Sequence, residues 1–187
     1  MLFRSINIKM NGNILYIIGN GFDIAHGISS KYELFYSYLY VSCYPFLNDL
    51  CGVYPQLSDN DKLWGEFEKE LSCYYAPIEV VDDSLEQMKT LESYQEGDFD
   101  YSIANCFIEG PIKKRSEVTD RLKVYFNSWI KQINISGCKS KCKFGEKSVF
   151  LTFNYTRTLE DVYEIKDNKI CHIHGKVDDA DLIIGHC

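Results

Sequence analysis

Polar residues follow three apolar stretches of the chain, each at the point where a buried strand would end. Residues 14–18 run into Gly-Asn-Gly-Phe-Asp, residues 148–153 into Asn-Tyr-Thr, and residues 169–173 into His-Gly. The carboxyl ends of parallel strands meet at one edge of an open α/β sheet, and such sheets bind ligands at that edge. The spacing therefore predicts one nucleotide-binding crevice, shaped by three segments that are far apart in the chain.

The first of these turns has part of the glycine spacing of a phosphate-binding turn. Gly19 and Gly21 let the backbone bend sharply and approach a ligand, and the helix that follows would offer N–H groups to phosphate. Ile24 stands where the third glycine of the dinucleotide fingerprint would be, so a plain strand-to-helix turn is an equal interpretation. Asp23 would bond a ribose hydroxyl or cap the turn, and His26 would be structural or bind the ligand.

The two later strand ends carry groups suited to a carboxamide and to proton transfer. Asn154 offers both a donor and an acceptor, as recognition of nicotinamide requires, although asparagine is also a common turn former. Alternation along a strand places His172 and His174 on one face. There a histidine can take a proton from a ribose hydroxyl or from water, or can bind a metal if a third ligand is present. Gly175 indicates that His174 lies at a tight strand end, open to a ligand.

Hydrophobic periodicity predicts the elements that would position these residues. Strands are expected over residues 13–18, 148–153, 169–173 and 181–185, and helices over residues 31–41, 59–71, 82–94, 116–137 and 156–164, with breaks at Pro45 and at residues 52–55. The stretch 56–137 exceeds the length of one crossover, so we expect a helical insertion or lid over the sheet. Residues 1–187 should form a single α/β nucleotide-binding domain. Because the chain ends directly after an apolar strand, we expect a C-terminus shorter than the complete fold.

The composition argues against several classes of protein. The net charge is −7 at pH 7, and a negative field repels phosphate backbones, so we do not expect a nucleic acid as partner. No apolar run is long enough to cross a bilayer, and residues 1–13 lack the apolar core of a signal peptide, which favours a cytoplasmic protein without a membrane role. The eight cysteines lack the paired spacing of a zinc ribbon, so we expect free thiols and no bound metal.

Taken in order, the motifs at residues 17–27, 153–160, 172–175 and 183–186 resemble the bacteriophage abortive-infection AbiH family. That family is in turn distantly similar to sirtuin-like domains. The resemblance implies a Rossmann-like, mostly parallel sheet that binds NAD, and antiphage versions of such domains cleave its nicotinamide bond.

Carried over to this chain, the resemblance implies that Gly19, Gly21 and Asp23 hold pyrophosphate and ribose. Asn154 would hold the nicotinamide ribose or amide, or orient a water, and His174 would be the general base. The remaining candidate ligand contacts are Asn20, Phe22, His26, Thr156, His172 and Gly175. Two features depart from the sirtuin pattern: Asn20 replaces an alanine, and Tyr155-Thr156 stands where a residue pair ending in Asp is usual. The four-cysteine zinc module is absent, which argues against protein deacylation.

These observations leave three hypotheses for the function. The first is an antiphage enzyme that binds NAD or a related nucleotide and cleaves its N-glycosidic bond. The second is a nucleotide sensor without turnover, whose helical middle binds a partner. The third is a metal-dependent phosphodiesterase or nuclease that uses His172, His174 and nearby acids. A nucleotide is the expected ligand; a phage-derived trigger, a partner protein and self-association remain open.

Overall fold

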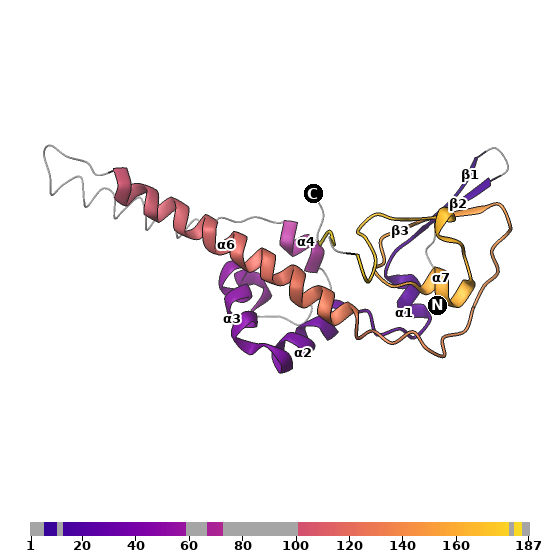
Figure 1. The fold of residues 1–187 in the computed structure, drawn as a ribbon, viewed down its shortest axis with the longest axis horizontal. Helices are drawn as coiled ribbons and strands as arrows, with labels where there is room; N and C mark the ends of the chain where they lie inside the picture. The colour runs from indigo at the N-terminus through magenta and orange to yellow at the C-terminus, as the bar shows by residue number, and fades with distance from the viewer. Residues whose placement is uncertain (1–5, 11–12, 59–66, 73–100, 180–181, 185–187) are drawn as a thin grey trace, which may run out of the picture.

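The computed structural model describes residues 6–10, 13–58, 67–72, 101–179 and 182–184. Its sheet has four strands in the order β1 (Ile6–Met10), β2 (Asn13–Ile18), β3 (Ser148–Thr152) and β4 (Ile170–His172). Strands β2, β3 and β4 are parallel, and β1 is antiparallel to β2 (Figure 1). The chain is therefore a mixed α/β protein with a small parallel sheet, as its sequence predicts.

Strand β1 was not among the expected strands. Its residues pair with β2 in a register that joins Met10 to Asn13, so the connection is only two residues long. The sequence of that connection is Asn-Gly, the strongest short-range signal for a hairpin. The opposite discrepancy concerns the strand expected over residues 181–185, because its described residues 182–184 are not in a strand.

The helices are α1 (Gly21–Ala25), α2 (Tyr32–Ser42), α3 (Tyr44–Val53), α4 (Phe67–Ser72), α6 (Tyr101–Ile130) and α7 (Thr158–Tyr163), with 3-10 turns η1 (Pro55–Leu57) and η3 (Asp167–Lys169). Three predictions are corrected here. Pro45 itself does not break the chain. It lies in the first turn of α3, where the backbone N–H that proline lacks would have no partner within the helix. Helix α6 begins well before Ser116, running through Gly110 and Pro111, and it ends at Ile130 rather than at Gly137. The helix expected over residues 82–94 lies outside the described residues.

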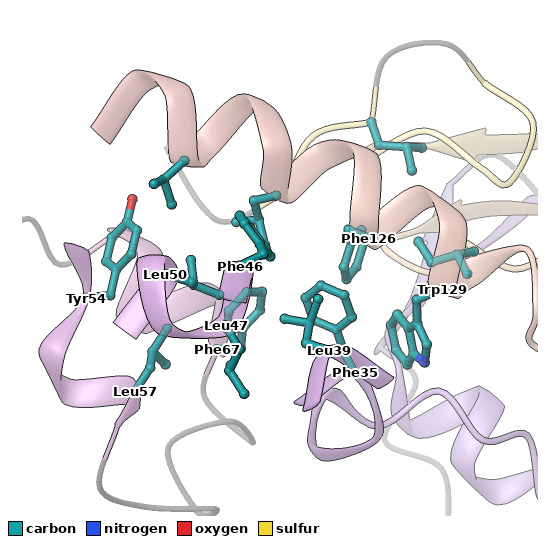
Figure 2. Close-up of a cluster of buried hydrophobic side chains, with 14 of the residues drawn as sticks. Phe35, Leu39, Phe46, Leu47, Leu50, Tyr54, Leu57, Phe67, Phe126 and Trp129 are labelled. Carbon is teal, nitrogen blue, oxygen red and sulfur yellow. The ribbon is translucent and has the colours of Figure 1, made fainter. Parts of the chain in front are cut away.

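The long helix α6 packs with α2, α3 and α4 in a lobe beside the sheet (Figure 1). The helical lobe thus includes α2 and α3 and is larger than the expected insertion over residues 56–137. Its core is a cluster of buried aromatic and aliphatic side chains (Figure 2), which includes Phe35, Leu39, Phe46, Leu50, Phe67, Leu122, Phe126 and Trp129. A separate, smaller cluster on the sheet consists of Ile18, Phe22, Phe150 and Leu159.

Among the described residues, no helix combines the length and the apolar character needed to span a membrane.

The turn after α1 requires a glycine, which gives a first prediction. Gly27 has a φ of +78°, and its amide donates to the carbonyl of Ile24 at the end of the helix. We expect Gly27→Ala to lower the free energy of unfolding by about 1 kcal/mol, since a Cβ disfavours this backbone conformation. Gly52→Ala is the matched control, because Gly52 lies in α3 without a positive φ and a Cβ at either glycine would meet no atom within 4 Å. Urea unfolding should show Gly52→Ala to be neutral or stabilising; equal losses in both variants would contradict the backbone explanation.

Candidate functional site

A cavity of about 260 Å³ lies where β2 and β3 end, between the sheet and the helical lobe. One side is polar and comes from the strand ends: Gly19, Asn20, Asp23, Ser30, Asn154 and Thr156. The other side is mainly apolar and aromatic: Tyr32, Phe126, Trp129, Ile130, Ile133, Phe153 and Tyr155, with Glu68 beside them. Segments that are more than a hundred residues apart thus form one pocket.

Asp23 is the most deeply buried polar group of this cavity, with 1% of its surface exposed. Its two carboxylate oxygens accept hydrogen bonds from the hydroxyls of Thr156, at 2.5 Å, and Thr158, at 2.8 Å. Burial raises the pKa of Asp23, while the hydrogen bonds from Thr156, Thr158 and Asn154 lower it by a smaller amount. The carboxyl group of Asp23, on α1 after β2, is thereby joined to the chain that follows β3, beside the backbone bond from the Phe153 N–H to the Ile18 carbonyl at 2.9 Å.

Asn154 presents a buried acceptor. The residue is 5% exposed, and its side-chain oxygen Oδ1 has no hydrogen-bond partner among the residues that the structure describes. Its backbone is held on both sides, because its N–H donates to Thr152 Oγ1 at 3.1 Å and its carbonyl lies 3.1 Å from His172 Nδ1. A buried acceptor left unpaired costs about 1–3 kcal/mol, so this oxygen is placed to receive a donor from a ligand.

The glycine turn is closed by Asn20 rather than left open. The amide nitrogen of Asn20 donates to the carbonyl of Ser30 at 2.9 Å, and its Oδ1 accepts from the Ser30 hydroxyl at 2.5 Å. This pair fixes the loop from Gly19 to Ser30, so that Gly19 and Asn20 line the cavity. Gly21 begins α1 and is not one of the residues that line the cavity.

Phe22 and His26, two of the predicted ligand contacts, pack in the sheet cluster instead. His26 Nδ1 donates to the carbonyl of Phe22 at 2.7 Å, and its Nε2 lies 2.6 Å from the Tyr163 hydroxyl. Burial raises the pKa of Tyr163 to about 12, so this hydroxyl keeps its proton and donates it to Nε2. The geometry gives His26 a structural role, which was one of the two interpretations of the sequence.

His172 also bonds to protein groups on both ring nitrogens. Its Nε2 lies 3.1 Å from Glu160 Oε1, and Lys176 Nζ lies 3.6 Å from the same oxygen. The two ring nitrogens of His172 thus bond to this carboxylate and to the Asn154 carbonyl. Through the contact of His172 with the Asn154 carbonyl, the Glu160–His172 pair holds the backbone of Asn154 in place. Gly175, another predicted contact, has a φ of +80° in the turn that follows.

The Glu160–His172 pair gives a prediction for acid. Burial raises the pKa of Glu160, but the hydrogen bond from His172 and the charges of His172 and Lys176 outweigh it, so the pKa lies below the ordinary 4.5. A carboxyl with a lowered folded pKa contributes stability above its unfolded pKa and loses it as the pH falls through the folded pKa. We expect the wild type to lose more free energy of unfolding than Glu160→Gln as the pH drops below 4.5. Parallel slopes in chemical denaturation across this range would contradict the pairing.

His174 lies behind the cavity wall rather than in it. It is 4% exposed, and it follows the end of β4 at His172, so the two histidines do not share a strand face as expected. Its Nδ1 lies 3.4 Å from the Tyr155 hydroxyl and 3.9 Å from Glu68 Oε1, and its ring contacts those of Phe153 and Tyr155. His174 therefore reaches the cavity through Tyr155 and Glu68, both of which line it.

The structure adds site residues that the sequence analysis missed, foremost Glu68, Tyr32 and Trp129. The sequence contains a signal for Glu68. The residues Trp64, Phe67, Glu68 and Leu71 follow the spacing of one apolar helix face, so a carboxylate occupies a core-facing position. A charge at such a position is costly unless it is bonded, and here the Tyr32 hydroxyl donates to Oε1, while the Tyr155 hydroxyl lies 3.5 Å from the same oxygen and donates to the Ile183 carbonyl.

His172 and His174 are turned to different partners, His172 to Glu160 and His174 to Tyr155 and Glu68. Across the part of the chain that the structure describes, no group of three or more His, Cys, Asp or Glu side chains could hold a metal ion.

Comparison with known proteins gives one match. A family model described as "Bacteriophage abortive infection AbiH" matches residues 15–187. No curated protein and no solved structure matches the chain significantly. The matched region begins within β2 and contains the helical lobe, β3, β4 and every residue that lines the cavity.

Proposed function

The chain belongs to the bacteriophage abortive infection AbiH family, and from this premise we propose that it binds NAD, or a related nucleotide, in the cavity and cleaves its N-glycosidic bond. The family implies a role in abortive infection. Loss of NAD would halt the metabolism of the infected cell, which is the outcome that abortive infection requires.

The observation that carries the proposal is the buried, unpartnered Oδ1 of Asn154. A buried acceptor favours ligands that present an N–H or O–H donor to it, because any other ligand leaves it unpaired. The carboxamide of nicotinamide supplies such a donor. The backbone bonds that hold Asn154 keep this oxygen in place before the ligand arrives.

The charges of the cavity also favour the nicotinamide end of NAD. Asp23 and Glu68 line it, and among the described lining residues there is no lysine or arginine. The pyridinium ring of NAD is positively charged, and cleavage moves this charge onto an oxocarbenium-like ribose. Carboxylates fixed beside the ring stabilise both charges, and Trp129 and Phe126 offer aromatic faces for a flat cation.

Asp23 also bears on the departure from the sirtuin pattern. This chain has Thr156 where an aspartate is usual, but the Thr156 hydroxyl bonds to the carboxyl of Asp23. A carboxyl group therefore occupies this end of the cavity, delivered from the end of β2 instead of from the end of β3.

The size of the cavity fits half of a dinucleotide. Pockets for drug-sized ligands are about 300–1,000 Å³, and a cavity of about 260 Å³ lies just below that range. We therefore assign it to the nicotinamide nucleoside, with the pyrophosphate near Gly19 and the adenosine outside.

The test is direct. Purified full-length chain is mixed with NAD, alone and with an extract of phage-infected cells as a source of trigger, and free nicotinamide is followed by chromatography. We expect nicotinamide and ADP-ribose in equal amounts. Absence of both products under both conditions would reject the enzyme.

A nucleotide sensor without turnover is the second candidate, favoured by one observation. His174, the expected general base, is buried behind Tyr155 and is not one of the lining residues. Isothermal titration calorimetry separates the two functions, because a sensor binds NAD or ADP-ribose without releasing nicotinamide.

A further inference from the structure

Glu68 is a carboxylate that reaches the cavity from the helical lobe. It belongs to α4, whereas the other polar groups of the cavity come from the strand ends and the turn after β2. Its side chain is 19% exposed, so it is neither sealed in the core nor free at the surface. The helical lobe therefore contributes a reactive group as well as an apolar wall.

The partners of Glu68 fix its direction. The Tyr32 hydroxyl donates to Oε1, and the Tyr155 hydroxyl lies 3.5 Å from the same oxygen. Burial and the nearby charge of Glu68 raise the pKa of both tyrosines, so they remain protonated donors. The bond from Tyr32 holds the carboxylate at a defined place on the cavity wall, with the Tyr155 hydroxyl beside it.

We propose that Glu68 is the catalytic base of the hydrolysis, an inference that rests on the proposed function. In the step, the oxygen of a water molecule forms a bond to C1′ of the ribose as the bond from C1′ to the ring nitrogen of nicotinamide breaks. The electron pair of the broken bond goes to that nitrogen and neutralises the ring. The proton of the water goes to the Glu68 carboxylate.

The next proton acceptor lies directly behind Glu68. His174 Nδ1 is 3.9 Å from Glu68 Oε1 and 3.4 Å from the Tyr155 hydroxyl, which itself bonds to Ile183 O at 2.7 Å. The Tyr155 hydroxyl donates to Ile183 O and so does not relay this proton; His174 Nδ1 can take it from Glu68 once the two atoms close from 3.9 Å to hydrogen-bond distance. This gives the buried His174 a function that does not require contact with the substrate.

Asp23 is less suited to this role. Both of its oxygens already accept hydroxyl protons, from Thr156 and Thr158. Its carboxyl is therefore committed to holding the strand end, whereas Glu68 Oε1 belongs to a half-buried side chain at the cavity. Asp23 therefore positions the neighbouring chain segments, and Glu68 takes the proton.

The experiment compares Glu68→Gln with wild type. Glutamine keeps an oxygen that accepts from Tyr32 but cannot take a proton. General-base removal typically costs about 10²–10⁴ in rate, so we expect kcat for nicotinamide release to fall at least about 100-fold. The Kd for NAD, measured by calorimetry, should change less than about three-fold. Glu33→Gln, an exposed carboxylate on α2, is the matched control and should retain the wild-type rate.

Two results would overturn the inference while leaving the proposed function intact: Glu68→Gln that releases nicotinamide at the wild-type rate, or a Kd that rises as much as kcat falls. If Glu68→Gln does not fold, Glu68→Asp is tested instead, because aspartate keeps the negative charge on a side chain that is shorter by one methylene. A wild-type rate of nicotinamide release in Glu68→Asp overturns the inference. A wild type that binds NAD without releasing nicotinamide overturns both the enzyme and its base, and leaves the sensor.

Discussion

Replacing Asn154 with leucine is expected to lower nicotinamide release at least about 100-fold while leaving the free energy of unfolding within about 1 kcal/mol of wild type. The buried Oδ1 of Asn154 has no partner, so its removal relieves a desolvation cost that the native fold carries. The loss of the side-chain hydrogen bond from Asn154 to Asp23 offsets this gain. Activity and stability should therefore separate, which is the behaviour expected of a polar group retained for a ligand.

A matched control exists on α6. Asn127 also has a buried Oδ1 without a partner, but it is not one of the residues that line the cavity. Asn127→Leu should match Asn154→Leu in urea unfolding and should retain the wild-type rate of nicotinamide release. If both variants lost activity, the effect would belong to packing in general, and the role assigned to the Asn154 oxygen would be wrong.

The parallel strands could be predicted because their apolar runs are short, β-branched and bounded by turn residues. Periodicity gave β2 with its observed bounds and placed β3 and β4 to within a residue or two. Strand β1 was missed although its alternation and the Asn-Gly connection predict a hairpin. The break expected at Pro45 lies two residues earlier, at Cys43 between α2 and α3, because a proline in the first turn of a helix costs no bond.

The two sides of the cavity differ in how visible they are in the sequence. Gly19, Asn20, Asp23 and Asn154 line it because parallel strand ends must share an edge, a rule that needs no tertiary information. The depth of His174 and the approach of Glu68 depend on how the helical lobe packs against the sheet. That packing is set by contacts such as the one between the rings of Phe126 and Tyr155, 4.9 Å apart, which join residues distant in sequence. No local pattern encodes them.

Asp23→Ala is expected to lower the free energy of unfolding by about 3 kcal/mol, whereas Asp23→Asn should cost much less. Alanine leaves the buried hydroxyls of Thr156 and Thr158 without their acceptor. Asparagine keeps an oxygen that accepts from one hydroxyl, and its amide can donate to the oxygen of the other. Both variants should lose nicotinamide release, because each removes the negative charge that the cavity offers to a cationic ligand.

The pH dependence of the free energy of unfolding shows whether burial of the Asp23 carboxylate destabilises the fold. Burial raises the folded pKa of Asp23 above the ordinary 3.8, so its contribution to stability is fully present below 3.8 and is lost as the pH rises through the folded pKa. Relative to Asp23→Asn, the wild type should therefore become less stable from acid to neutral pH in urea unfolding. Asp161→Asn, an exposed aspartate on α7, should show no such trend. If the difference in the free energy of unfolding between wild type and Asp23→Asn stayed constant with pH, burial would not raise the pKa of the Asp23 carboxyl. The loss of activity in Asp23→Asn would then have to come from geometry rather than from charge.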